Sequence, residues 1–196
     1  MEILYMNICV FGSASKNIDK KFIEMGEHLG EELAKRGHKL VYGAGSTGMM
    51  GAVARGFKKG NGKILGIIPK FFEEKGYEGI NYECDRFVYT QSMSERKMTM
   101  SNMCDAYIIV PGGIGTFEEF FEVLTLKQLN VHRKAIVVFD MDGYYKEMNQ
   151  MMKAAIEKEF VRDECDKLYV TKKTEEEVIN YLENYTEGDI NWGILK

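Results

Sequence analysis

The segment Ala106-Tyr-Ile-Ile-Val110 is a near-continuous apolar run, and Ala135-Ile-Val-Val-Phe139 is a second run of the same kind. Between them, residues Thr116–Gln128 follow a helical pattern. Short apolar runs without polar alternation are typical of strands that are buried on both faces, as in a parallel sheet. The unit therefore predicts two parallel strands joined by a crossover helix.

The same alternation of strand and helix patterns covers the rest of the chain. Further strands are expected at Asn7–Phe11, Lys39–Tyr42, Lys63–Ile68, Arg86–Tyr89 and Leu168–Val170. Further helices are expected at Phe22–Arg36, Met49–Lys58, Met93–Met103, Tyr144–Lys158 and Glu175–Asn184. The pattern predicts a doubly wound, Rossmann-like α/β fold, with one parallel sheet and helices on both faces. We expect a single domain over residues 1–186 and a loose C-terminal tail over 187–196, where periodicity ends.

Composition excludes several classes of protein. With 196 residues, 45% of them hydrophobic and 29% charged, the chain has the size and make-up of one globular domain. Its net charge of −4 argues against a general binder of nucleic acid or anionic membrane. We find neither a leader pattern nor an apolar run of ~18 residues, so neither secretion nor membrane insertion is expected.

Cysteine and histidine spacing gives no sign of a metal site. The cysteines are Cys9, Cys84, Cys104 and Cys165, which lie far apart and form no C-x-x-C pair. The histidines are His28, His38 and His132, which show no ligand spacing with one another. We therefore expect a reduced, cytoplasmic protein that holds no metal.

Three glycine-rich turns follow expected strands, at Gly12–Ser15, Gly43–Gly51 and Pro111–Thr116. In a doubly wound fold ligands bind at these carboxyl ends of the strands. Gly43-Ala-Gly-Ser-Thr-Gly48 matches the dinucleotide pattern G-x-G-x-x-G, but it follows the second strand, and Asn61–Ile68 lacks the acidic residue that would hold a ribose. A tight strand-to-helix turn is the favoured interpretation, and the missing lysine excludes a P-loop. Gly12-Ser-Ala-Ser15 could contact a phosphate or be a simple turn.

Pro111-Gly-Gly-Ile-Gly-Thr-Phe-Glu-Glu119 carries the strongest signal in the chain. It leaves a buried strand, crosses three glycines and enters a helix expected to start at Thr116. Exposed amides at a helix N-terminus suit a phosphate, and glycines let the ligand approach the backbone closely. The alternative is a capping box of Thr116 and Glu119, which explains those two residues but not the glycines.

A second signal precedes it at Ser92-Met-Ser-Glu95, a capping-box pattern followed at once by Arg96 and Lys97. Two cations near a helix N-terminus oppose the helix dipole, at a cost of a few tenths of a kcal/mol each, and a bound anion would offset that cost. The alternative is a solvated pair on an ordinary surface helix.

Together these segments resemble the LONELY GUY family of nucleoside 5′-monophosphate phosphoribohydrolases, whose signature is M-x-x-R-K followed by P-G-G-x-G-T-x-x-E. The turns Gly12–Ser15 and Tyr42-Gly-Ala-Gly-Ser-Thr-Gly-Met-Met-Gly51 match the family's order of motifs, so the resemblance covers roughly Met6 to Val138. Members are often described as possible lysine decarboxylases. That description fits poorly, because a pyridoxal-phosphate decarboxylase needs a larger scaffold and a cofactor lysine, so no cofactor is expected.

The resemblance implies hydrolysis of the N-glycosidic bond of AMP or an N6-substituted AMP by a nucleotide-binding homodimer. It implies catalytic roles for Arg96 and Glu119. It implies substrate-binding roles for Glu78, Lys97, Gly112, Gly113, Gly115, Thr116 and Thr125, with Glu73 or Glu74 as alternatives to Glu78 in an irregular segment. The chain departs from the family at Ser94, commonly histidine, and at Leu126, commonly tryptophan, which puts a preference for prenylated adenine in question.

Two other functions remain open from sequence. A non-catalytic nucleotide or cofactor carrier would need the phosphate loop but not Glu119, so the presence of Arg96 and Glu119 favours the enzyme. An NAD-dependent oxidoreductase is disfavoured by the missing ribose-binding acid.

Overall fold

The computed structural model describes residues 5–75 and 79–187, within which seven parallel strands form one sheet. The strands are β1 (Asn7–Phe11), β2 (Lys39–Tyr42), β3 (Lys63–Pro69), β4 (Arg86–Thr90), β5 (Ala106–Ile109), β6 (Ala135–Phe139) and β7 (Val170–Lys172). The α-helices are α1 (Lys20–Lys35), α2 (Gly48–Lys59), α3 (Lys70–Lys75), α4 (Met93–Asn102), α5 (Ile114–Gln128), α6 (Lys146–Glu157) and α7 (Glu175–Glu183). Two 3₁₀ helices, η1 (Met141–Gly143) and η2 (Asp163–Lys167), join the last strands and helices.

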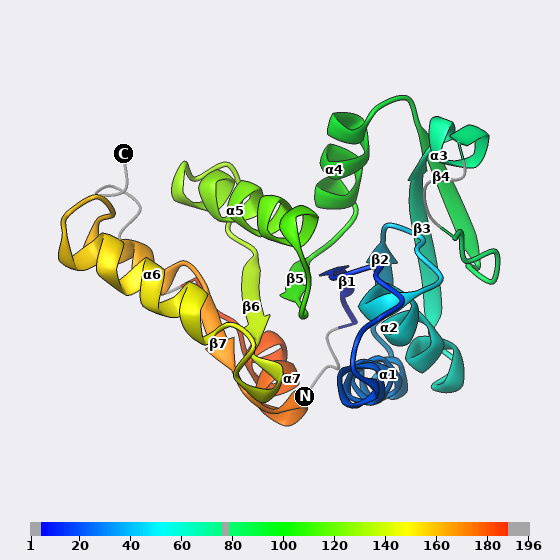
Figure 1. The fold of residues 1–196 in the computed structure, drawn as a ribbon, viewed down its shortest axis with the longest axis horizontal. Coiled ribbons are helices and arrows are strands. Elements are labelled where there is room, and N and C mark those ends of the chain that lie inside the picture. Colours follow the sequence, from blue (N-terminus) through cyan, green and yellow to red (C-terminus); the bar gives the residue numbers. More distant parts are fainter. Residues whose placement is uncertain (1–4, 76–78, 188–196) are drawn as a thin grey trace.

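Helices cover both faces of the sheet, which confirms the doubly wound class (Figure 1). On one face, Leu33 of α1, Phe57 of α2 and Ile179 of α7 pack against the strands in one apolar core. On the other face, Met100 of α4 and Phe120 of α5 belong to a second core, against which α6 also packs. The strands separate these two cores, as expected of runs buried on both faces.

The strand order is β4-β3-β2-β1-β5-β6-β7. Strands β2 to β4 are therefore added on one side of β1 and strands β5 to β7 on the other, so the strand order reverses between β1 and β5. β1 pairs with both neighbours, and Cys9 lies opposite Val41 of β2 and Tyr107 of β5. A reversal of this kind opens a crevice outside the carboxyl ends of the two central strands. The turn after β1 and the glycine loop after β5 meet at that crevice.

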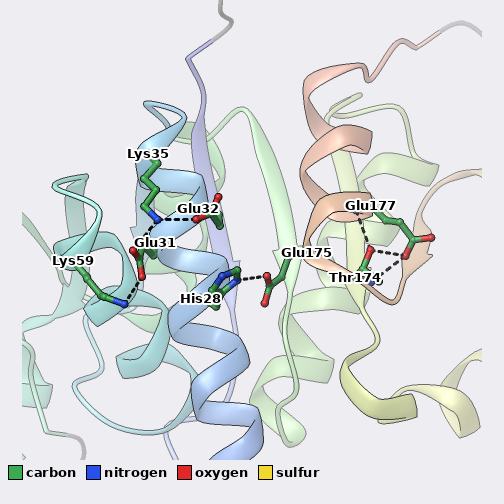
Figure 2. Close-up of polar contacts among 8 residues, drawn as sticks. All are labelled: His28, Glu31, Glu32, Lys35, Lys59, Thr174, Glu175 and Glu177. Atoms are coloured by element: carbon green, nitrogen blue, oxygen red, sulfur yellow. Dashed lines mark hydrogen bonds and ion pairs between the residues drawn. The ribbon is translucent and has the colours of Figure 1, made fainter.

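Surface ion pairs tie the helices of one face to each other (Figure 2). Glu31 of α1 pairs with Lys59 of α2 at 2.5 Å, and His28 of α1 contacts Glu175 of α7. Thr174 and Glu177 form a capping box at the start of α7. These contacts hold α1, α2 and α7 together on the face away from α4 and α5.

Several helix ends differ by one or two residues from the sequence predictions, and three differences matter most. α3 forms between the strands expected at Lys63–Ile68 and Arg86–Tyr89, where no helix was predicted, and α5 begins at Ile114 rather than Thr116. The last strand lies at Val170–Lys172 rather than Leu168–Val170, because Leu168 is fully buried in the core just after η2 and its apolar side chain gave a strand-like pattern too early. The tail residues 188–196 lie outside the described residues. Within the described part of the chain, none of the helices has the length and apolarity needed to span a bilayer.

Candidate active site

A cavity of about 270 Å³ lies at the carboxyl edge of the sheet, between the turn after β1 and the helices α4 and α5. It is lined by Gly12, Ser13, Ala14, Met50, Met93, Arg96, Gly113, Gly115, Thr116, Glu118 and Glu119. A hollow of about 580 Å³ lies at the opposite, amino edge of the strands, and another of about 680 Å³ lies beside α7. The smaller cavity is the candidate site, because ligands of doubly wound folds bind at the carboxyl edge.

The glycine loop forms the wall on the α5 side. Gly113 is the N-cap residue of α5, and a Cβ added to Gly113 or to Gly115 would meet no atom within 4 Å. Both glycines therefore leave open space at the positive end of the helix, as an anion site requires. Gly112 is packed differently, since a Cβ there would lie 2.0 Å from Thr116 Oγ1.

The capping-box alternative for Thr116 and Glu119 is wrong. Because α5 begins at Ile114, Thr116 is the third helical residue, and its buried side chain lies against Gly112. Glu119 is a full turn into the helix and lines the cavity. The pattern was misleading because glycine has low helix propensity, so the helix was expected to begin only after the three glycines, at Thr116. In the structure Gly113 is the N-cap residue and Gly115 lies in the first turn.

Arg96 is buried, with 4% of its surface exposed, and main-chain oxygens hold it in place. Nε donates to the carbonyl of Ile67 at 3.1 Å, and Nη2 donates to the carbonyl of Gly43 at 3.2 Å. The guanidinium also lies 5.7 Å from the ring centre of Phe72. A solvated surface pair is therefore the wrong interpretation for Arg96.

Helix α4 sets the direction of that arginine. Ser92 caps the helix by accepting a hydrogen bond from the Glu95 amide at 3.1 Å, as predicted. The Glu95 carboxylate accepts from the amide of Gln91 at 2.7 Å, one residue before the cap. This fixed start places Arg96 on the side of α4 that faces the carboxyl ends of β2 and β3.

Arg96 and Glu119 meet across the cavity. Nη1 of Arg96 lies 3.9 Å from Oε1 of Glu119, and the side chains are only 5% and 14% exposed. Charges separated from bulk water interact more strongly than on an open surface. The two residues expected to be catalytic are thus brought together from different helices, in a cavity large enough for part of a nucleotide.

The G-x-G-x-x-G pattern is explained by packing around this site. A Cβ on Gly43 would lie 1.7 Å from Arg96 Nη2, so glycine makes room for the guanidinium. Gly48 has a φ of +63° and lies against the carbonyl of Ser13. The turn therefore supports Arg96 and the turn after β1, which is the strand-to-helix interpretation made from sequence.

Lys97 turns away from Arg96. Its ammonium pairs with Glu118 and, at 3.0 Å, with Glu122, so it joins α4 to α5 outside the cavity lining. Thr125 is exposed on α5, beyond the residues that line the cavity. Glu78 lies outside the described residues.

Sequence reasoning missed Met50, Met93 and Glu118 as lining residues. In the sequence, Met50 stands out only as part of the Gly43–Gly51 turn and Met93 only as part of the motif before Arg96, so neither receives a role of its own. Their place next to the glycine turns was the available signal, because first-turn residues of helices after strands face the carboxyl edge.

A buried thiol lies on the strand beneath the charged pair. Burial raises the pKa of Cys9 well above its ordinary value, and a hydrogen bond with Cys104 raises it further. Cys9 is therefore a neutral core residue rather than a thiolate nucleophile. Among the residues that the structure describes, no three His, Cys, Asp or Glu side chains gather into a metal-binding group.

Known proteins resemble the chain in both sequence and fold. The family model for possible lysine decarboxylase matches residues 50–182. The probable cytokinin riboside 5′-monophosphate phosphoribohydrolase LOGL1 of Oryza sativa subsp. japonica is 35% identical, over 92% of this chain and 80% of that protein. The cytokinin riboside 5′-monophosphate phosphoribohydrolase LOG7 of Arabidopsis thaliana is 34% identical, over 92% and 82%.

Solved structures with the same fold include proteins of another function. The molybdenum cofactor carrier protein of Chlamydomonas reinhardtii has a TM-score of 0.68 at 21% identity, covering 90% of this chain and 95% of that one. The molybdenum cofactor binding protein of Rippkaea orientalis has a TM-score of 0.68 at 18% identity, covering 91% and 96%. At these identities the likeness confirms the fold alone. The sequence relatives are closer, and the family model and the curated relatives agree with the motifs around Arg96 and Glu119: the chain belongs to the LONELY GUY family, whose model is described as possible lysine decarboxylase.

Proposed function

We propose that the protein hydrolyses the N-glycosidic bond of AMP or an N6-substituted AMP, releasing the free base and ribose 5-phosphate. One observation carries the proposal: Arg96 and Glu119 face each other at 3.9 Å in a cavity whose wall is the glycine-rich start of α5. The curated relatives with this activity in their names match over nine-tenths of the chain.

The phosphate is assigned to the start of α5. Gly113 and Gly115 leave the backbone open there, and the unpaired amides of a first helical turn carry partial positive charge. Binding the phosphate fixes the ribose relative to the cavity. Positioning of this kind lowers a barrier by several kcal/mol when the geometry is tight.

The charged pair is assigned to the reacting bond. As the C1′–N bond breaks, its electron pair leaves with the base and positive charge develops on the ribose ring, as in other glycosidic cleavages. The carboxylate of Glu119 stabilises that charge and accepts a proton from the water that attacks C1′, and that proton then passes to the departing base, which leaves as the neutral free base. Arg96, which two main-chain carbonyls hold in place, keeps Glu119 oriented and presents a cation to the departing base or the phosphate.

A carrier of nucleotide or cofactor is the second candidate, because the same fold occurs in molybdenum cofactor carrier proteins. The glycine loop would serve a carrier equally well. A carboxylate beside the loop has no task in a carrier, whereas glycosidic hydrolysis needs one to stabilise the charge on the ribose ring. Glu119 therefore favours the hydrolase.

The two departures from the family pattern lie outside the lining of the main cavity. Ser94 and Leu126, where the chain departs from the family pattern, line a separate hollow of about 240 Å³ between α4 and α5. Met93, by contrast, lines the candidate site. The departures therefore leave the walls beside Arg96 and Glu119 unchanged, and both adenine and N6-substituted adenine are included in the proposal.

The deciding experiment is chromatographic. Purified protein is incubated with AMP and with N6-isopentenyl-AMP, alongside Glu119→Gln, and free base is quantified. We expect base from the wild type alone, with AMP still bound by Glu119→Gln in a titration. Binding without base release by the wild type would favour the carrier, and normal turnover by Glu119→Gln would contradict the role of that carboxylate.

The homodimer and the cytoplasmic location stay predictions from the resemblance and from composition. Light scattering on the purified chain measures the first, and fractionation of cells that express it measures the second.

A further inference from the structure

Two adjacent tyrosines, neither of which lines the cavity, donate hydrogen bonds to main-chain carbonyls at the start of the glycine loop. The hydroxyl of Tyr144 donates to the carbonyl of Gly112 at 2.7 Å, and the hydroxyl of Tyr145 donates to the carbonyl of Val110 at 2.8 Å. Both tyrosines follow η1, the short turn between β6 and α6. The loop after one central strand is therefore held by the connection after the next strand.

That connection is itself fixed by buried polar contacts. Asp140, at the end of β6, accepts a hydrogen bond from the amide of Tyr145 at 2.6 Å. Asp142 and Gly143 adopt left-handed backbone angles, with φ of 53° and 77°, which turn the chain sharply between Asp140 and Tyr145. Asp142 also pairs with Lys21 at the start of α1. The tyrosines thus project from a rigid turn.

The carbonyl directions of the loop determine where its amides point. In a trans peptide the C=O and the following N–H lie on opposite sides of the chain. The carbonyl of Pro111 accepts from the amide of Ser13 at 3.2 Å, so the Gly112 amide points away from Ser13. The carbonyl of Gly112 faces Tyr144, so the Gly113 amide points away from Tyr144. Gly113 lines the cavity, whereas Tyr144 is not among the lining residues.

We propose that Tyr144 is a positioning residue for the anion site: its hydroxyl, by holding the Gly112 carbonyl, aims the Gly113 amide into the cavity. The inference rests on the proposed function only in taking the anion to be the substrate's 5′-phosphate. Tyr144 contacts the loop from outside the cavity lining, so it acts through the peptide that it orients.

Tyr145 provides a matched control within the same turn. It donates to the carbonyl before Pro111, and the Val110–Pro111 peptide has no N–H to aim. Both variants to phenylalanine remove one hydroxyl and keep the ring. Tyr144 packs edge-on against Phe22 of α1, with ring centres 6.2 Å apart, and Tyr145 packs in the same way against Phe117 of α5 at 6.3 Å.

The experiment measures ribose 5-phosphate and adenosine binding by calorimetry, for the wild type, Tyr144→Phe and Tyr145→Phe. We expect Tyr144→Phe to weaken ribose 5-phosphate binding about 5- to 10-fold, as for loss of one hydrogen bond to a charged ligand. Adenosine, which lacks the phosphate, should bind all three proteins equally. Tyr145→Phe should lower the melting temperature and keep ribose 5-phosphate affinity within twofold. In the hydrolysis assay Tyr144→Phe should raise KM for AMP more than it lowers kcat.

Each other outcome overturns a distinct statement. Equal ribose 5-phosphate affinity in Tyr144→Phe and the wild type overturns the role of Tyr144, as does an equal loss in both variants, which would indicate general support of the loop. A wild type that binds no ribose 5-phosphate also overturns it. If ribose 5-phosphate binding is weakened in Tyr144→Phe but not in Tyr145→Phe, while the wild type releases no base, the role of Tyr144 stands and the hydrolase is contradicted instead.

Discussion

Replacing Gly43, which does not itself line the cavity, by alanine tests how Arg96 is held. The added Cβ would lie 1.7 Å from Nη2 and 2.9 Å from Cζ of the guanidinium. Gly43 has no left-handed φ, so its backbone accepts alanine and the effect is purely steric. To reach an ordinary contact of 3.4 Å the guanidinium must retreat by roughly 1.7 Å.

That retreat breaks the hydrogen bond from Nη2 to the Gly43 carbonyl, now 3.2 Å, and changes the 3.9 Å approach of Nη1 to Glu119. A hydrogen bond to a charged group is worth about 1.5–3 kcal/mol, which lowers the melting temperature of a chain of this size by roughly 5–10 °C. A displacement of about 1 Å at reacting groups costs on the order of 100-fold in rate. We therefore expect Gly43→Ala to lose at least about 100-fold in kcat for AMP.

The assay is a double-mutant cycle on base release, with melting curves alongside. Arg96→Lys removes the guanidinium that Gly43→Ala would displace. If Gly43→Ala acts through Arg96, adding it to Arg96→Lys should cost little further activity, whereas independent sites would add their effects. Gly43→Ala with activity within tenfold of the wild type, or with a full additional loss in the Arg96→Lys background, would contradict the geometry described for Arg96.

Three further outcomes follow from individual environments. Gly113→Ala should lower the melting temperature by only a few degrees, because its Cβ meets nothing within 4 Å and the cost is that of alanine as a poorer N-cap, yet weaken ribose 5-phosphate binding measurably in calorimetry by filling the anion site. Burial lowers the pKa of His132 to about 4, with Lys134 adding to the effect. As the pH falls, the unfolded state therefore takes up a proton on His132 before the folded state does. The free energy of unfolding should then fall by about 1–2 kcal/mol from pH 7 to pH 4, after allowance for solvent screening. Urea titrations measure this change, and His132→Gln should reduce it. Burial also lowers the pKa of Lys127 to about 8. Lys127→Met removes this buried charge and should raise the free energy of unfolding at pH 7 by about 1–3 kcal/mol in the same titrations. The Tyr185 hydroxyl, which accepts a hydrogen bond from Lys127, keeps a partner in the variant because it also donates to a main-chain carbonyl.

The fold was predictable because its signals are local. Strands such as Asn7–Phe11 and Ala135–Phe139 coincide with their predicted bounds, since a run of apolar residues buried on both faces needs no distant partner to be recognised. Boundaries failed where an apolar side chain packs outside a strand, as at Leu168, or where glycines begin a helix, as at Gly113.

The site was predictable only as a set of segments. Sequence placed Arg96 near a helix start and Glu119 on a helix after a glycine loop, but not their 3.9 Å approach. Lys97 shows the limit of such reasoning. Arg96 faces the cavity, but Lys97, the next residue along the helix, points about 100° away from it and pairs with Glu118. The hydrogen bond of Tyr144 joins residues 32 positions apart, and no spacing rule reveals it.

The topology separates binding from the proposed chemistry. The glycine loop, which is proposed to hold the phosphate, is local to β5 and α5, in one half of the sheet. The charged pair needs both halves, because Arg96 is anchored to the carbonyls of Gly43 and Ile67, after β2 and within β3, while Glu119 lies on the helix after β5. The pair therefore bridges the point where strand order reverses. A relative shift of the two halves by an ångström would uncouple Arg96 from Glu119 and leave the anion site intact. Under the proposed function, hydrolysis depends on that long-range register, and Gly43, which lies outside the cavity lining, is one of the residues that sets it.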